Sequence, residues 1–197
     1  MISEKYKSDL VQVRIGDPAW GGSAVRNAGP DVLRFLTRRK DVKSVLDFGS
    51  GLGTLGEYVA VQQKAGLLRD DIEWTNYDPG ILGIDRLPTR TFDCVLSTDL
   101  LEHIEPDRLN VTLDWMRAHA ARSQFHHIDC NDNKQLLPDG RSVHLIVQPP
   151  QWWRDQLGSA GWKIMRFNEI MDVKRGRERF SCLITLDRTI PMESTNG

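Results

Sequence analysis

The stretch Val45–Glu57, VLDFGSGLGTLGE, decides the fold that this sequence predicts. It begins with apolar residues that suit a buried strand. Glycines follow at alternate positions, where the backbone must turn sharply into a helix: Gly49, Gly51 and Gly53. Because such a turn presents backbone N–H groups to a ligand, the unit suits a nucleotide-like cofactor. A glycine turn without a ligand is the alternative.

Asp47, near the carboxyl end of the predicted strand, indicates which charge the loop accepts. The glycines also satisfy the dinucleotide spacing GxGxxG. At about 6 Å and an effective dielectric near 20, however, a carboxylate would repel a pyrophosphate charge by roughly 3 kcal/mol and attract a cation. S-adenosylmethionine (SAM) carries a sulfonium and an ammonium and has no phosphate. Asp47 therefore favours SAM over a dinucleotide.

The pattern acid-x-Gly-x-Gly-x-Gly resembles the first motif of the class I SAM-dependent methyltransferases, and all four positions match. The resemblance implies a Rossmann-like α/β sandwich with a mostly parallel sheet. It also implies that Asp47 helps to hold the methionine end of SAM, that the loop Gly49, Ser50, Gly51 and Gly53 passes beneath it, and that S-adenosylhomocysteine (SAH) is the product. Over about Tyr6 to Leu157 the chain is similar to short methyltransferase-domain proteins of bacterial and phage genomes.

A second acid follows the strand predicted over residues 72–77. Asp78 stands where α/β folds place the group that binds the ribose hydroxyls. An Asp-Pro-Gly turn capped by its own backbone is the alternative. The resemblance implies further cofactor contacts at Pro79, Asp85, Leu87, Asp99 and Leu100.

The sheet is expected to depart from the family pattern at one edge. Only 13 residues lie between Asp78 and Phe92, too few for a crossover helix and another strand. We therefore expect a shortened strand-3 edge, with residues 79–91 running over the cofactor. At the other end, residues 162–171 and 180–186 predict an antiparallel hairpin with a basic turn over residues 172–179. The remaining periodicity predicts helices over 30–40, 54–64 and 106–121, a helix after Pro149-Pro150, and strands over 92–97 and 123–129.

The domain organisation follows from composition and length. The 197 residues suit one domain, predicted over residues 29–187. Residues 1–28 are polar around Trp20 and are either a lid over the cofactor or a tail pinned by that side chain; residues 188–197 are a predicted disordered tail. The 26 basic and 27 acidic residues nearly balance, which excludes a global basic field for nucleic acid or membranes. Three scattered cysteines and no run of 18 apolar residues indicate a soluble, cytoplasmic protein.

Candidate catalytic residues lie in the second half of the chain. Methyl transfer from a sulfonium needs no metal, so none is predicted, but a hydroxyl or amine acceptor must lose a proton. The candidate bases are His144, His127 and Asp129, and the predicted acceptor contacts are Arg141 and Trp152. His126 and His127 face opposite ways in a strand, so only one can face the site. Glu102 and His103, in the phrase DLLEHIEPD that resembles the family's fourth motif, either take part in catalysis or brace the next helix.

The leading hypothesis is a methyltransferase acting on a small-molecule or sugar hydroxyl. Methylation of a nucleotide or nucleic acid is an alternative, motivated by the basic hairpin turn. A domain that holds the cofactor without transferring anything is a third. The acceptor and the oligomeric state stay open.

Overall fold

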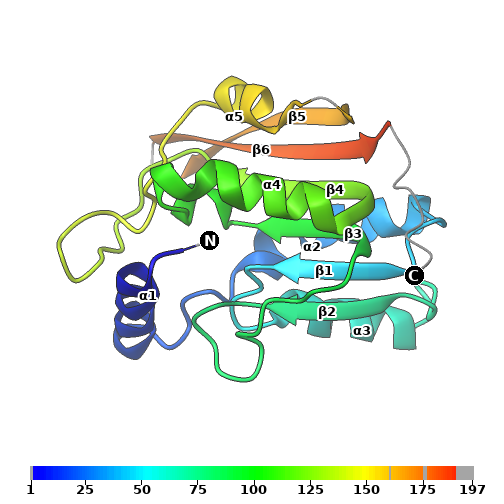
Figure 1. The fold of residues 1–197 in the computed structure, drawn as a ribbon, viewed down its shortest axis with the longest axis horizontal. Coiled ribbons are helices and arrows are strands. Elements are labelled where there is room, and N and C mark those ends of the chain that lie inside the picture. The colour runs from blue at the N-terminus through cyan, green and yellow to red at the C-terminus, as the bar shows by residue number, and fades with distance from the viewer. Residues whose placement is uncertain (1, 160, 175–176, 190–197) are drawn as a thin grey trace.

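The computed structural model describes residues 2–159, 161–174 and 177–189 (Figure 1). In these residues the strands form one six-stranded sheet of order β2-β1-β3-β4-β6-β5. Four strands pair in parallel: β1 (Ser44–Phe48), β2 (Glu73–Tyr77), β3 (Phe92–Thr98) and β4 (Ala120–Asp129). The hairpin of β5 (Trp162–Lys174) and β6 (Arg177–Arg188) is antiparallel and joins the sheet through β4. The predicted fold class, a mostly parallel sheet ending in an antiparallel hairpin, is confirmed.

The shortened sheet edge is confirmed as well. β2 is the edge strand, and residues 78–91 connect it to β3 without a helix or a strand. The register aligns Phe48 with Tyr77 and Thr98 with His127. The carboxyl ends of the parallel strands therefore meet at one edge of the sheet, which is where α/β folds bind ligands.

Helices cover both faces of the sheet. On one face, α2 (Ala24–Arg38) and α3 (Thr54–Lys64) bury residues against Val45. On the other face, α4 (Leu109–His119) and α5 (Pro150–Leu157) pack in the cluster that holds Leu46. The alternation of strand side chains produces these two cores. Between β3 and α4 lie two short 3₁₀ helices, η1 (Leu101–His103) and η2 (Pro106–Arg108).

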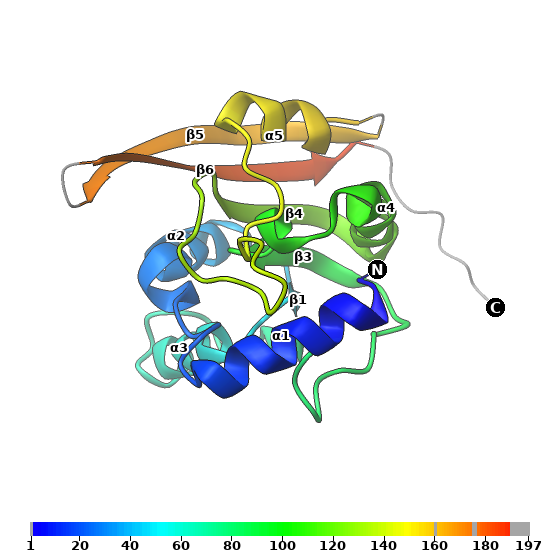
Figure 2. The same ribbon diagram turned by 90° about the vertical axis from the view of Figure 1, so that its left-hand side faces the viewer.

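The N-terminal segment contains a helix that the sequence reading missed. α1 (Glu4–Gly16) begins at Ser3, whose hydroxyl accepts a hydrogen bond from the Tyr6 N–H. Its buried residues pack on the chain after β4, in a small cluster of Tyr6, Leu10, Val13, Leu137 and Val143. In Figures 1 and 2 the helix lies across the carboxyl ends of the parallel strands. Part of the polar segment expected here is thus a helix, α1, that covers the carboxyl ends of the parallel strands. Its function as a lid stays a prediction.

Several predicted helix and strand boundaries were wrong. α2 begins at Ala24, ahead of Pro30, because Ala24 and Ala28 are buried in the core; the helix therefore crosses the domain boundary predicted at residue 28. α4 ends at His119, and β4 begins at once with Ala120. The hairpin strands extend through residues 172–174 and 177–179, so the basic turn is shorter than expected. Residues 175–176 of that turn and 190–197 of the predicted tail lie outside the described residues.

None of the helices that the structure describes has the length and apolar composition to cross a membrane.

Candidate active site

A cleft of about 1250 Å³ opens at the carboxyl ends of the parallel strands, beside α1. Ligand sites typically have volumes of roughly 300–1,000 Å³, so this cleft has room for a cofactor and an acceptor together. Most of the predicted site residues line it: Gly49, Ser50, Gly51, Asp78, Pro79, Asp99, Leu100, His127, Asp129 and His144.

Other predicted site residues do not line this cleft: Asp47, Gly53, Asp85, Leu87, Arg141 and Trp152. Arg141 pairs with Asp139, with 2.7 Å between Nη2 and Oδ2. The ring of Trp152 packs edge-on against Trp153, 4.9 Å between centroids. The roles predicted for these residues stay predictions.

Two neighbouring parts of the chain lie so close to the glycine loop that they leave no room for side chains there. A side chain at Gly49, where φ is +80°, would place Cβ 2.4 Å from a methyl carbon of Leu100. At Gly51, where φ is +53°, Cβ would lie 2.2 Å from the carbonyl oxygen of Gly21. The same Gly21 oxygen accepts a hydrogen bond from the Leu52 N–H at 3.2 Å. Only glycine fits these positions without moving the neighbouring backbone or side chain.

The N–H groups of this loop are already paired, contrary to the expectation that they face a ligand. Those of Gly49 and Ser50 donate to the Tyr77 oxygen at 2.7 and 3.0 Å, and that of Gly51 donates to the Asp78 carboxylate at 3.0 Å. The reason is that β2 runs beside β1, so its last residues lie within reach of the turn. The loop therefore offers a ligand a surface free of side chains.

Asp47 lies in the protein interior. Its side chain is fully buried, and neither carboxylate oxygen has a hydrogen-bond partner among the described residues. Burial, and secondly the charge of Asp78, raise the pKa of Asp47 to about 8. At pH 7 the carboxyl is therefore mostly protonated, and its predicted contribution to cofactor binding would require that the bound cation ionise it across the loop.

Asp78 is held by three donors. Arg14 Nη2, from α1, lies 3.0 Å from each of its carboxylate oxygens. The N–H groups of Gly51 and Gly80 donate to the same carboxylate at 3.0 and 2.9 Å. The Asp-Pro-Gly turn therefore has the backbone cap of the alternative interpretation and, in addition, a charged partner that the sequence did not reveal. The remaining Arg14 nitrogens, Nε and Nη1, are buried without a partner among the described residues.

A carboxylate–histidine pair lies across the cleft. His127, on β4, donates from Nδ1 to Oδ1 of Asp99, which follows β3, over 2.8 Å. The Asn27 amide, from α2, donates to the other Asp99 oxygen. Burial alone would raise the pKa of Asp99, but the hydrogen bond and charge of His127 outweigh it and lower that pKa. Asp99 adopts a positive φ of 51°, unusual for a residue other than glycine.

His126 faces the other way, as strand alternation predicts. It is bonded to Ser97 and Gln124 in the core, and burial lowers its pKa to about 3. Of the adjacent histidines, His127 is the one that lines the cleft.

The two remaining candidate bases carry other bonds. His144 lies 2.5 Å from the Asn131 oxygen through Nδ1 and 3.0 Å from the Asn133 amide through Nε2. Asp129 accepts from Asn131 and, at 2.7 Å, from Arg179. Both residues line the cleft, as predicted, but their polar atoms are engaged.

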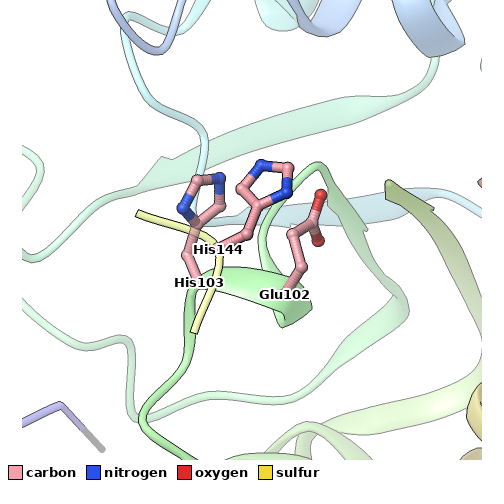
Figure 3. Close-up of side chains that lie close together, drawn as sticks. All are labelled: Glu102, His103 and His144. Atoms are coloured by element: carbon pink, nitrogen blue, oxygen red, sulfur yellow. The ribbon is translucent and has the colours of Figure 1, made fainter. Parts of the chain in front are cut away.

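Next to His144 lie Glu102 and His103 from η1 (Figure 3). Burial and the charge of Asp99 raise the pKa of Glu102, while burial and His144 lower that of His103 to about 4. The His103 imidazole is therefore neutral at pH 7. Each of the three residues offers a ligand atom, and these atoms lie within 4.8 Å of one another.

The sequence analysis missed two cleft residues whose side chains bond the predicted acids Asp78 and Asp99: Arg14 and Asn27. The spacing of Tyr6, Leu10 and Val13 is a helical signal that could have revealed α1 and so the position of Arg14. No local signal relates Asn27 to Asp99, since these residues are 72 positions apart.

Comparison with known proteins agrees with this architecture. Residues 23–127, more than half of the chain, match the family described as a methyltransferase domain. No curated protein matches the chain.

Solved structures show the fold. The 1,6-didemethyltoxoflavin-N1-methyltransferase of Burkholderia thailandensis, bound to 1,6-didemethyltoxoflavin and SAH, superposes with a TM-score of 0.64 at 18% identity, covering 93% of this chain and 87% of that one. A DhpI–SAH complex gives a TM-score of 0.52 at 18% identity, covering 92% and 97%. Magnesium protoporphyrin IX methyltransferase from Synechocystis PCC 6803, with bound SAH, gives 0.50 at 18% identity, covering 82% of each chain. The chain belongs to the methyltransferase domain family and has the fold of the class I SAM-dependent methyltransferases.

Proposed function

We propose that this methyltransferase transfers the methyl group of SAM to a hydroxyl of a small molecule or sugar, with His127 as the general base. The observation that carries the proposal is the pair of Asp99 and His127, 2.8 Å apart and lining the cleft beside the glycine loop. A hydroxyl acceptor must lose a proton during transfer, and an imidazole oriented by a carboxylate is suited to take it.

The residues present fit SAM. Gly49 and Gly51 line the cleft with backbone alone, because Leu100 and Gly21 leave no room for a side chain at either position. Asp78 would hold the ribose, and the unpartnered Nε and Nη1 of Arg14 suit the carboxylate of the methionine end. A cation above the loop would favour the ionised form of the buried Asp47 carboxyl and would in turn be stabilised by it. Bound there, SAM would supply a methyl group on a positively charged sulfur.

The residues of the chain then have separable tasks. Asp99 accepts from His127 Nδ1 and so keeps Nε2 unprotonated, ready to take the hydroxyl proton. The acceptor oxygen would take the methyl group that SAM supplies, with the electron pair of the methyl–sulfur bond left on sulfur, and His127 Nε2 would take the hydroxyl proton. The cover of α1 helps to keep water from the reacting atoms.

Two further observations support a small acceptor. Arg179, one of the cations that suggested nucleic acid, is engaged with Asp129 at 2.7 Å. The neighbours from Burkholderia thailandensis and Synechocystis are named for small acceptors, a toxoflavin precursor and a magnesium porphyrin.

The test begins with calorimetric titration of SAM and SAH into the wild type and Asp78→Ala. We expect the wild type to bind both and the variant to bind both at least tenfold more weakly. Transfer of labelled methyl groups is then measured on a panel of hydroxylated small molecules and on extracts with and without nuclease treatment. No SAM binding by the wild type overturns the proposal. Label that appears only in nucleic acid selects the alternative acceptor, and SAM binding without transfer selects a non-catalytic domain.

A further inference from the structure

The cleft holds a second group of titratable side chains that the proposed proton transfer does not use: Glu102, His103 and His144. The first two come from η1, directly after β3, and the third comes from the chain segment that follows β4. Figure 3 shows the carboxylate and both rings extending to the same side of the backbone, with His144 between the other two. The two rings meet edge-on, 4.7 Å between centroids. Residues 41 positions apart are thus brought together in one wall of the cleft.

Backbone groups hold all three side chains in place. His103 Nδ1 lies 2.8 Å from the Val143 oxygen and His144 Nδ1 lies 2.5 Å from the Asn131 oxygen, so each Nδ1–H donates to a carbonyl. This pattern leaves a lone pair on Nε2 of both rings, the arrangement that histidines adopt when they bind metals. Oε1 of Glu102 accepts from the Asp129 N–H at 3.0 Å. The orientation of the cluster therefore exists before any ligand is bound.

One oxygen of the cluster lacks a partner. Glu102 is fully buried, and its Oε2 has no hydrogen bond among the residues that the structure describes. A buried carboxylate oxygen without a donor is unfavourable, and the neighbouring Asp99 and Asp129 add negative charge. A cation bound between Glu102 and the two imidazoles would satisfy this oxygen. It would also offset the local charge.

We propose that Glu102, His103 and His144 bind a divalent first-row transition metal ion, with coordination positions left open to the cleft. Two imidazole nitrogens and one carboxylate oxygen suit ions such as Fe²⁺, Co²⁺ or Zn²⁺ better than Mg²⁺ or Ca²⁺, which prefer all-oxygen sites. Metal bonds of about 2.0–2.2 Å place neighbouring ligand atoms about 3 Å apart. Ion binding therefore draws the three side chains together and displaces the Asn133 amide from His144 Nε2.

The open positions give the site a task that rests on the proposed function. Three protein ligands leave room for water or for an acceptor oxygen, as in catalytic metal sites. A hydroxyl bound to the ion loses its proton more readily, and the ion fixes the oxygen within the cleft that His127 lines. The class of acceptors proposed above, small hydroxyl compounds, then narrows to those that can also coordinate a metal ion. The sequence analysis predicted no metal because methyl transfer from a sulfonium needs none and the cysteines lack zinc spacing.

The test is titration of tag-free, metal-free protein with Co²⁺, whose visible absorption reports bound nitrogen and oxygen ligands. We expect one ion per chain in the wild type and displacement of the band by Zn²⁺. Glu102→Gln and His144→Asn should each weaken Co²⁺ binding at least tenfold. His119→Asn is the matched control, because His119 bonds the Trp115 oxygen and lies outside the cluster. Circular dichroism verifies that each variant is folded.

Absence of saturable Co²⁺ binding in the wild type overturns the inference, whatever the variants do. Equal Co²⁺ affinity in the wild type, Glu102→Gln and His144→Asn overturns it as well, since the ion then binds elsewhere. SAM titration on the same samples separates the two proposals. SAM binding without Co²⁺ binding removes only the metal site, whereas Co²⁺ binding without SAM binding removes only the proposed methyl transfer.

Discussion

Arg14 Nη2 donates to both carboxylate oxygens of Asp78, at 3.0 Å each, and thereby joins α1 to the end of β2. Asp78 is only 5% exposed, so solvent screens this ion pair weakly. The residue expected to hold the ribose thus also fastens the helix that covers the cleft. If Asp78 holds the ribose as proposed, one carboxylate would couple cofactor binding to the position of α1.

The first prediction concerns the strength of this pair. A double-mutant cycle with Arg14→Ala and Asp78→Asn, followed by urea unfolding, should give a coupling free energy of about 1–3 kcal/mol, because both partners are largely buried. The exposed pair of Arg90 and Glu73 is the control and should give less than about 1 kcal/mol. Equal coupling in the two cycles would contradict the prediction.

The second prediction concerns the close approach at Gly51. Gly51→Ala should lower the free energy of unfolding by about 3 kcal/mol or more, because Cβ would meet the Gly21 oxygen in addition to the strain of a positive φ. Gly66→Ala isolates the strain, since Gly66 has φ +68° but no atom within 4 Å of the added carbon. It should lower the free energy by only about 1–2 kcal/mol. Chemical denaturation of both variants measures the difference, and similar losses would show that Gly21 yields to the methyl group.

The third prediction concerns pH. The pKa of Asp47 is about 8 in the folded protein against an ordinary 3.8, so the folded state binds this proton more tightly than the unfolded state. The resulting stabilisation is complete below about pH 4 and is lost as the pH rises through 8. Asp47→Asn should remove this pH dependence and raise the free energy of unfolding at pH 8 by on the order of a few kcal/mol. The variant should also bind SAM more weakly.

Unfolding of Asp47→Asn is measured by denaturant titration at several pH values. Asp93 supplies a control of opposite sign: burial raises its pKa, but N–H donors from Lys43 and Ser44, together with Arg122, outweigh burial and lower it. Asp93→Asn should therefore lower stability, and most at neutral pH. A stability of Asp47→Asn that follows the wild type at every pH would disprove the raised pKa of Asp47.

The fourth prediction concerns the proposed base. His127→Asn should reduce the rate of methyl transfer about 10²–10⁴-fold while leaving the SAM dissociation constant within a few-fold of the wild type. Asp99→Asn should also reduce the rate, because an uncharged amide has one acceptor oxygen for two donors, His127 Nδ1 and the Asn27 amide, and the ring loses its fixed orientation. His119→Asn serves as the control with unchanged rate. Single-turnover kinetics separates transfer from binding, and an undiminished rate in His127→Asn would exclude it as the base.

Much of the fold could be predicted because its signals are local. Helix α3 has the predicted bounds, Thr54–Lys64, since glycines precede it and Leu55 and Val59 repeat at helical spacing. The shortened sheet edge could be predicted because the chain between Asp78 and Phe92 is too short for a crossover helix and another strand. By contrast, α1 was missed because its buried stripe is short and is stabilised by contacts with Leu137 and Val143, far away in the chain.

The sequence by itself determined the α/β architecture, the glycine loop and the acids near the carboxyl ends of β1 and β2, because each depends on residues close together in the chain. Only the tertiary structure decided what these groups face: Asp78 meets Arg14, the loop N–H groups are already bonded, and Asp47 is sealed beneath the loop. It also brought Glu102 and His103 to His144. Such contacts join segments that the sheet register and the packing of α1 bring together, and no pattern within a single segment specifies them.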